Sequence, residues 1–213
     1  MLILAFDCSG PACSVAVWRD GAILAQEREL MERGQAEALM PMIDRVMKAA
    51  GVNYADLTRI AVTTGPGSFT GVRSGLAAAR GLTLASEVPT VGILTTEALA
   101  AAIPESERKG ARLLAAIDTK RGDFYVQQFG TDGAARGAPE ALSAEALPAW
   151  IDGPVVIVGD AAAAHAFEGR AAVSSAPSLV DLGVLAALAA KTAPQPGGPA
   201  PVYVHPPAVT LPS

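Results

Sequence analysis

The stretch that decides the fold is Gly65-Pro66-Gly67-Ser68-Phe69-Thr70-Gly71-Val72-Arg73, called the glycine block below. It follows a short apolar segment, residues 59–64, and it precedes residues 72–86, whose side chains are mostly small. Glycines permit positive φ angles and close approach of other backbone, and Ser68 or Thr70 can cap a helix. A strand, a tight turn and a capped helix in this order predict an α/β protein.

Three strands are predicted before the glycine block. An apolar run over residues 2–6 ends at Asp7, and residues 12–18 and 22–30 form two further extended segments. Asp20-Gly21 between the last two is a strong hairpin signal. Antiparallel strands therefore open the fold.

Two helices are predicted to form a protein interface. Residues 35–50 place apolar side chains at helical spacing, and Gly51 is positioned to end that helix. Four of the five methionines lie between positions 31 and 47, and methionine suits adaptable contact surfaces. In the 72–86 helix, small residues recur every four positions, which lets another helix approach closely. The predicted interface residues are Met40, Ile43, Met47, Val72, Leu76 and Ala79; the alternative is an ordinary core stripe, which also includes Ala36, Leu39, Val46 and Ala50.

The second half of the chain repeats the pattern of the first. Residues 113–118 echo residues 2–7, each ending in an aspartate, although the repeat is degenerate and chance similarity stays open. The polar residues 104–110 mark the boundary, which predicts lobes at 1–103 and 110–213. Strands are expected at 90–94, 124–129 and 155–159, helices at 95–102, 143–151, 160–167 and 179–191, a loop at 193–201 and an extended segment at 202–204.

Two strand-end aspartates indicate a phosphate site. A carboxylate followed by turn amides and hydroxyls can hold phosphate or metal-bound phosphate. Asp7 with Ser9 is one such set, Asp118 is the second, and Gly67 with Ser68 adds backbone from the glycine block. The block is no Walker loop, because no Gly-Lys-Ser/Thr follows it. The alternative is that both aspartates only cap strand ends.

Composition excludes several functions. The net charge of −5 and the isoelectric point near 5.0 match a nucleic-acid backbone poorly. The two histidines, His165 and His205, are isolated and no CxxC occurs, so neither a metal site nor a catalytic residue is predicted. Cys8 has no base nearby in sequence and is expected to be a buried structural thiol. No run is long enough for a membrane helix or a signal segment, which predicts a cytoplasmic protein.

Several motifs together resemble the TsaB (YeaZ) family. They are Leu4-Ala5-Phe6-Asp7-Cys8-Ser9, Gln35 before Leu39-Met40-Pro41-Met42-Ile43, Gly65 through Gly75, Ala115-Ala116-Ile117-Asp118-Thr119-Lys120-Arg121-Gly122 and Pro201-Val202-Tyr203-Val204. The resemblance is good over residues 1–125 and looser beyond them. It implies a two-lobed actin/hexokinase-like fold, of the ASKHA and ribonuclease H-like class, with mixed sheets flanked by helices.

The resemblance also implies a function. TsaB proteins take part in making threonylcarbamoyladenosine in tRNAs that read codons beginning with A. It implies a non-catalytic scaffold without a cofactor of its own, which binds a TsaD-like catalytic subunit, works with a TsaE-like ATPase and forms homodimers in isolation. Contact with tRNA is expected only through the complex, and no membrane is involved. The alternative is a small ATP-dependent phosphotransferase or ATPase, and weak ATP or ADP binding at Asp7, Ser9, Gly67, Ser68 and Asp118 is compatible with either.

Three positions depart from the related patterns. TsaD-like proteins carry an HxxxH metal motif after the strand that follows the glycine-block helix, and here Thr95 and Leu99 occupy those places. No metal is therefore expected, and the older description of the family as glycoprotease-like loses its support. Arg33 stands where relatives commonly have histidine before Gln35, and its role is left open.

Overall fold

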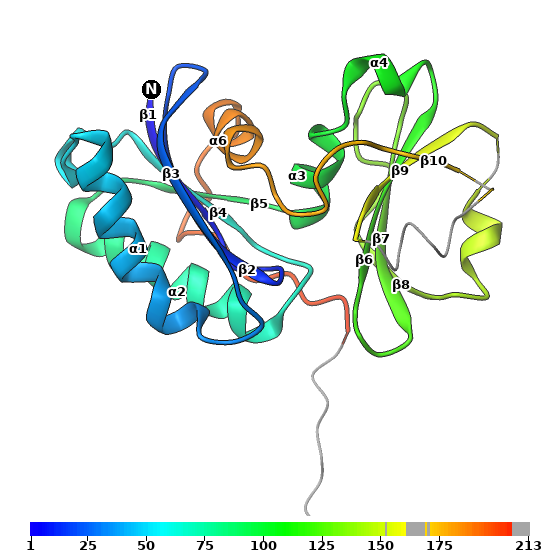
Figure 1. The fold of residues 1–213 in the computed structure, drawn as a ribbon, viewed down its shortest axis with the longest axis horizontal. Helices are drawn as coiled ribbons and strands as arrows, with labels where there is room; N and C mark the ends of the chain where they lie inside the picture. Colours follow the sequence, from blue (N-terminus) through cyan, green and yellow to red (C-terminus); the bar gives the residue numbers. More distant parts are fainter. Residues whose placement is uncertain (152, 161–168, 170, 206–213) are drawn as a thin grey trace, which may run out of the picture.

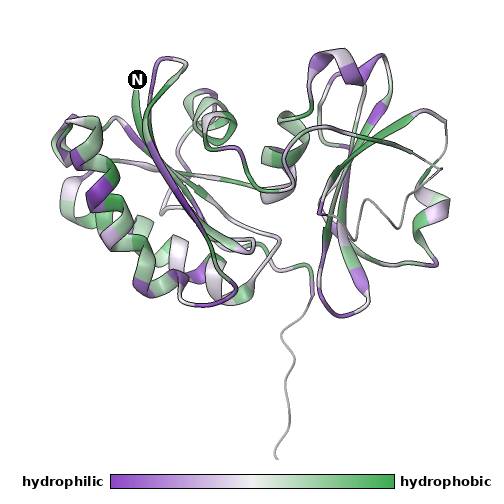
Figure 2. Cartoon of the chain, in the orientation of Figure 1, coloured by the Kyte–Doolittle hydropathy of each residue, from purple (hydrophilic) through white to green (hydrophobic). Residues whose placement is uncertain are grey.

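The computed structural model describes residues 1–151, 153–160, 169 and 171–205. Two mixed five-stranded sheets lie side by side, each flanked by helices (Figure 1). Hydrophobic residues run along the central strands, and hydrophilic residues gather in the loops (Figure 2). This is the predicted α/β fold with two mixed sheets.

The first sheet has the order β3-β2-β1-β4-β5. β1 to β3 are antiparallel, whereas β4 and β5 run parallel to β1. The Asp20-Gly21 turn between β2 and β3 has positive φ at both residues, 46° and 101°, as a type I′ hairpin requires. The strand bounds are β1 Leu2–Asp7, β2 Ala12–Arg19, β3 Ala22–Leu30, β4 Arg59–Thr63 and β5 Thr90–Ile93.

Three long helices cover this sheet. The helices α1 (Gln35–Ala50) and α2 (Phe69–Ser86) lie together on one face and share a buried core with β1, β2 and β4. The helix α6 (Leu182–Lys191) covers the opposite face, which is turned toward the second sheet (Figure 1). The short helix α3 (Thr95–Ala101) follows β5 and packs against β6 of the second sheet.

The second sheet repeats the topology of the first. Read from the β8 edge, its order is β8-β7-β6-β9-β10, with antiparallel pairing among β8, β7 and β6 and parallel pairing among β6, β9 and β10. Strand order and direction match β3-β2-β1-β4-β5 one for one, so β6 is the counterpart of β1. This correspondence supports a structural duplication behind the degenerate repeat. The bounds are β6 Arg112–Asp118, β7 Asp123–Phe129, β8 Glu140–Ser143, β9 Val155–Gly159 and β10 Ala172–Val173.

Some predicted elements differ from the observed ones. Residues 143–151 do not form one helix: β8 ends at Ser143 and only a short 3₁₀ segment, η2 (Leu147–Trp150), follows. The helix α2 begins at Phe69, three residues earlier than predicted, because the Ser68 hydroxyl accepts a hydrogen bond from the Gly71 amide. The helix α6 begins at Leu182 after its cap Asp181. Residues 161–168 of the helix predicted at 160–167 lie outside the described residues. The remaining short elements are η1 (Tyr54–Asp56) and α4 (Glu105–Arg108).

The C-terminal part of the chain returns to the first sheet. α6 packs on β1, β4, β2 and β5, although it follows the second sheet in sequence. The predicted first lobe, residues 1–103, thus contains the first sheet with α1 and α2, whereas the other face of that sheet is covered by α6 from the predicted second lobe, residues 110–213. We therefore propose that the second lobe contributes α6 to the first, so that the chain cannot be divided at residue 110 into two independently folding domains. In the part of the chain that is described, no helix is long and apolar enough to cross a membrane.

Candidate functional site

The glycine block packs against the turn that follows β1. The Ser68 amide donates a hydrogen bond to the Ser9 carbonyl oxygen at 2.7 Å. A Cβ atom at Gly71 would lie 1.8 Å from the Cys8 carbonyl oxygen, and one at Gly67 would lie 2.3 Å from that of Ser9. Glycine is required here so that two backbone segments can touch.

The Asp7 carboxylate is buried and used within the chain. Its Oδ1 atom accepts hydrogen bonds from the Ser9 amide at 2.9 Å, the Ser9 hydroxyl at 2.6 Å and the Thr63 hydroxyl at 2.6 Å. The structure therefore brings together four of the predicted phosphate-site residues, Asp7, Ser9, Gly67 and Ser68. These residues form hydrogen bonds with one another: the Ser9 amide and hydroxyl donate to Asp7, and the Ser68 amide donates to the Ser9 carbonyl.

A small cavity lies beside Asp7 between the two sheets. Its volume is about 70 Å³, whereas pockets for small-molecule ligands usually measure roughly 300–1,000 Å³. Thr95, which stands at the first position of the HxxxH motif named above, contributes a buried hydroxyl with no hydrogen-bond partner among the described residues. The cavity is lined by Asp7, Ser9, Gly10, Pro11, Thr95, Leu99, Ile117, Asp160, Ser178, Leu179 and Val180.

The second carboxylate at this cavity is Asp160, not Asp118. Asp118 binds the Lys120 ammonium at 2.8 Å and the Lys120 amide at 2.7 Å. Partial burial acts to raise the pKa of Asp118, but these hydrogen bonds outweigh it and the pKa is lowered. The Asp118 amide in turn donates to Asp160 Oδ2 at 2.9 Å. From the sequence, Asp160 was expected only as the first residue of a helix and not as a site residue. It directly follows β9, the counterpart of β4, and this position at a strand end could have indicated its role.

The two thiols lie together in the core of the first lobe. Cys8 Sγ and Cys13 Sγ are 3.8 Å apart, and both residues are buried. The hydrogen bond with Cys13, together with burial, raises the pKa of the Cys8 thiol. Cys8 is therefore the buried thiol that was predicted. Among the described residues no group of three His, Cys, Asp or Glu could hold a metal ion.

The predicted interface needs a correction. Ile43, Met47, Val72, Leu76 and Ala79 are all buried between the helix pair and the sheet, so they cannot meet a partner. Of the six predicted residues only Met40 is exposed, at 43%. The buried side of α1 is formed by Gln35, Leu39, Met42, Ile43, Val46 and Met47, which turns Ala36 and Met40 outward. The large exposed apolar residues of the pair are Met40, Phe69 and Leu84, the last at 87%.

Residues 192–205, called the C-terminal strap, connect the two lobes. The Gln195 side chain binds both the amide and the carbonyl of Gly92 in the edge strand β5, at 3.0 and 3.2 Å. The Val202 amide donates to the Thr64 carbonyl at 2.8 Å, and His205 Nε2 lies 2.7 Å from Asp123 Oδ2 in β7. Figure 1 shows the strap crossing from the first sheet to the second in orange and red. The predicted loop at 193–201 is thus a fixed connection.

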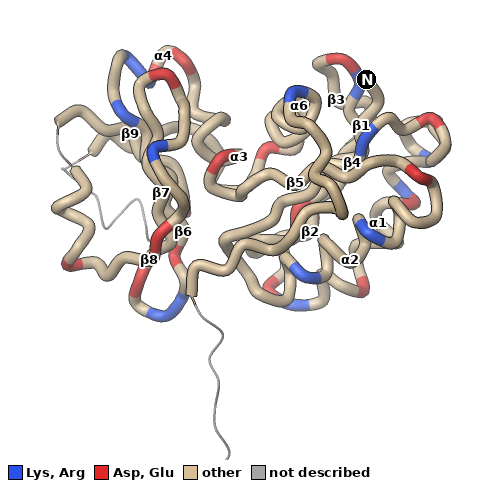
Figure 3. Tube along the Cα trace, turned by 180° about the vertical axis from the view of Figure 1, so that it is seen from behind, with Lys and Arg blue, Asp and Glu red and all other residues tan. Residues whose placement is uncertain are grey.

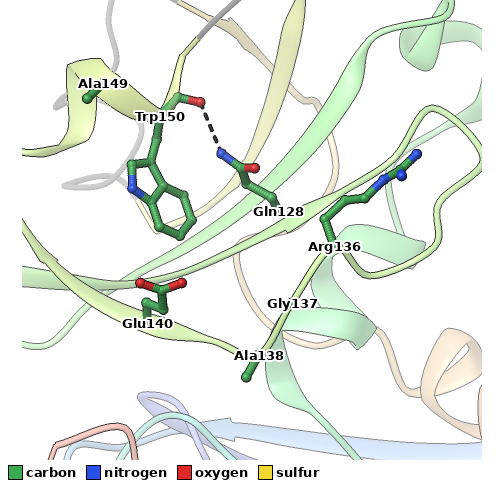
Figure 4. A pocket seen from close by; sticks show the side chains of 7 residues that line it. All are labelled: Gln128, Arg136, Gly137, Ala138, Glu140, Ala149 and Trp150. Atoms are coloured by element: carbon green, nitrogen blue, oxygen red, sulfur yellow. Dashed lines mark hydrogen bonds between the residues drawn. The ribbon is translucent and has the colours of Figure 1, made fainter.

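A second, larger cavity lies in the second lobe. It measures about 300 Å³, and Figure 4 shows that the Gln128 side chain, which donates to the Trp150 carbonyl at 3.2 Å, lies beside the Trp150 ring. No motif in the sequence predicted this cavity. Its lining residues are Gln128, Arg136, Gly137, Ala138, Glu140, Ala149 and Trp150.

Comparison with known proteins gives consistent matches. Residues 27–146, more than half of the chain, match the family described as TsaD, tRNA N6-adenosine threonylcarbamoyltransferase. The tRNA threonylcarbamoyladenosine biosynthesis protein TsaB of Escherichia coli is 39% identical over 133 residues, which cover 62% of this chain and 56% of the relative. The chain spans about half to three fifths of the length of such curated relatives.

Solved structures extend the likeness to nearly the whole chain. YeaZ from Pseudomonas aeruginosa superimposes with a TM-score of 0.77 and 28% identity, covering 95% of this chain and 99% of that one. The ADPNP-bound activator of 2-hydroxyisocaproyl-CoA dehydratase from Clostridium difficile has a TM-score of 0.55 at 12% identity and shows the fold alone.

Proposed function

This chain belongs to the TsaB (YeaZ) family, and we propose that it is a non-catalytic scaffold subunit in tRNA threonylcarbamoyladenosine biosynthesis. In this role it binds a TsaD-like catalytic subunit and acts with a TsaE-like ATPase. Threonylcarbamoyl is transferred to adenosine in tRNAs that read codons beginning with A, and tRNA is bound through the complex. In isolation the chain forms homodimers.

The small cavity between the sheets carries the proposal. It lies where the two halves of the duplication meet, at the ends of β1 and β9, and its volume of about 70 Å³ is well below that of a nucleotide pocket. Thr95 and Leu99 line it, and neither hydroxyl nor isobutyl groups replace the imidazoles that bind transition metals. The residues of this site therefore suit a structural role better than group transfer.

The proposed partner surface is the exposed side of the helix pair α1 and α2. Five of the six interface residues predicted from the sequence are buried, so they are not part of this surface. Met40 and Leu84 are exposed apolar residues on two adjacent helices. Elsewhere on the exposed side of α1, Arg45 and Lys48 form ion pairs with Glu27 and Asp44. The cores of protein interfaces are enriched in methionine and depleted of charged residues, so the exposed Met40 suits the core of such a surface.

Reconstitution tests the proposal directly. Threonylcarbamoyl transfer to tRNA is measured with the TsaD-like and TsaE-like subunits, with and without this chain, and with this chain alone. We expect transfer only when the chain is added to its partners. Transfer by the chain alone would make it an enzyme, and undiminished transfer without it would remove it from the reaction.

Nucleotide affinity separates the proposal from the phosphotransferase alternative. Asp7, Ser9 and the glycine block do meet as a phosphate site requires, but their donors are used within the chain. We expect calorimetry with ATP and Mg²⁺ to show binding no tighter than millimolar. Micromolar affinity, lost on Asp7→Asn, would favour the alternative.

A further inference from the structure

Three side chains from distant parts of the sequence stack at the start of α2. The Arg73 guanidinium carbon lies 4.4 Å from the centre of the Phe69 ring. Tyr203 of the C-terminal strap packs on Phe69, with the ring centres 5.2 Å apart and the ring planes tilted by 33°. We call this stack of Arg73, Phe69 and Tyr203 the aromatic ladder.

The aromatic ladder is exposed yet held in place. Phe69 is 48% exposed and Tyr203 43% exposed. Next to Tyr203, the Val202 amide is hydrogen-bonded to Thr64, and Phe69 is in the first turn of the capped helix α2. Large rings with few rotatable bonds, fixed before binding, lose little entropy when a partner covers them. Tyrosine and arginine are among the residue types that most often dominate binding energy, and phenylalanine is enriched at interfaces.

The charge at the aromatic ladder is positive and unpaired. Arg73 makes no ion pair or hydrogen bond within the part of the chain that is described. It lies near the N-terminus of an 18-residue helix whose first turn has no acidic residue. A helix N-terminus carries partial positive charge, and the guanidinium of Arg73, stacked on the first-turn residue Phe69, adds a full positive charge close to it. A partner that presents a carboxylate would relieve this repulsion and form a charge-assisted hydrogen bond.

We infer that the aromatic ladder binds an acidic, partly apolar segment of the TsaD-like catalytic subunit. The inference rests on the proposed function and names one docking point at the start of α2. Phe69 and Tyr203 supply the apolar contact, and Arg73 binds the carboxylate. Because Tyr203 comes from the strap, the docking point exists only while the strap is seated across the first sheet.

A protein fits these observations better than RNA does. Stacked aromatic and arginine side chains also bind single-stranded bases, but nucleic-acid surfaces gather many cations on one face. Figure 3 shows Lys and Arg interspersed with Asp and Glu over the helices and sheets of this acidic chain. One free guanidinium suits one carboxylate more than a run of phosphates.

Calorimetric titration of the purified TsaD-like subunit into the full chain tests the inference. We expect Phe69→Ala and Tyr203→Ala each to weaken binding about tenfold or more, as at interface hot spots. Arg73→Glu should weaken it further than Arg73→Gln. Tyr203→Phe keeps the ring and should bind like the wild type. Val173→Ala removes an apolar side chain that is 54% exposed on β10 of the second sheet, and it should have no effect.

The outcomes separate the two claims. The inference about the aromatic ladder is wrong if Phe69→Ala and Tyr203→Ala bind the TsaD-like subunit as tightly as the wild type does and melt at the same temperature. The proposed scaffold role would then still hold. No binding by the wild type would overturn both. If these variants weaken binding of tRNA but not of the TsaD-like subunit, the surface binds RNA and the inference is wrong.

Discussion

The Ser68 amide nitrogen donates a hydrogen bond to the Ser9 carbonyl oxygen at 2.7 Å, and this bond joins the glycine block to the turn after β1. In a phosphate-binding protein such turn amides would remain free for the anion. Here the two segments bind each other, and Ser9 also binds Asp7. The glycine block therefore stabilises the junction of β1, β4 and α2.

Gly71→Ala tests this contact. The added Cβ would lie 1.8 Å from the Cys8 carbonyl oxygen, and backbone on both sides leaves little room to yield. We expect the free energy of unfolding to fall by more than about 2 kcal/mol, in the range of severe overpacking. Urea denaturation followed by circular dichroism measures the change.

Gly81→Ala is the matched control on the same helix. A Cβ there meets nothing within 4 Å, and alanine is favoured over glycine inside helices by roughly 0.8–1 kcal/mol. We expect this variant to be more stable than the wild type. Equal stabilisation by both changes would show that helix propensity, and not contact with the Cys8 backbone, governs position 71.

Met40→Asp and Leu76→Asp should act in different ways, although both positions were predicted at the interface. Leu76 is 3% exposed, and an unpaired carboxylate in that core should lower the free energy of unfolding by more than about 3 kcal/mol. Met40 is 43% exposed, so Met40→Asp should change stability by no more than about 0.5 kcal/mol. Thermal melts of the isolated chain check both values.

Binding separates the same two variants. Met40→Asp should weaken association with the TsaD-like subunit while the chain stays folded. A Met40→Asp variant that associates like the wild type would place the partner surface away from the second turn of α1.

Gln195→Ala should loosen the C-terminal strap. It removes both hydrogen bonds to Gly92, at 3.0 and 3.2 Å, and leaves two polar groups of β5 without their partners. At about 0.5–1.5 kcal/mol for each bond, we expect a loss of roughly 1–3 kcal/mol and faster amide exchange in β5. Gln26→Ala, at an exposed position of β3, should change stability by less than about 0.5 kcal/mol. Unchanged exchange at Gly92 would show that the strap does not depend on Gln195.

Glu97 should make stability depend on pH. Burial raises the pKa of this carboxyl above its ordinary 4.5, against the opposing effect of the hydrogen bond from the Leu94 amide. The folded state then holds its proton more tightly than the unfolded state, so this contribution favours folding at low pH and is lost as pH rises from about 4.5 through the folded pKa. Relative to the wild type, Glu97→Gln should gain stability across that window. If the free energy of unfolding of the two proteins differed by the same amount at every pH from 4 to 8, the predicted effect of Glu97 would be wrong.

The elements near the N-terminus were predictable because their signals are local. The Asp20-Gly21 hairpin, the apolar runs of β1 and β2 and the capped start of α2 each depend on neighbouring residues alone. The sequence grouped Asp7, Ser9 and the glycine block as a phosphate site, but it did not show that their polar groups bind one another. Residues 140–143 and 172–173 form strands without such a pattern, because β8 and β10 are short edge strands specified by the neighbours they join.

By itself the sequence determined the three antiparallel strands that open the fold, the helical character of residues 35–50 and 72–86, and the family. Only the tertiary structure decided which side of those helices is buried, since apolar residues at both Met40 and Met42 allow more than one rotation, and packing on β1 and β2 selected Met42. It also decided that Asp160 and not Asp118 faces the cavity, and that Tyr203 reaches Phe69. These are contacts between residues far apart in the chain, and no local periodicity encodes them.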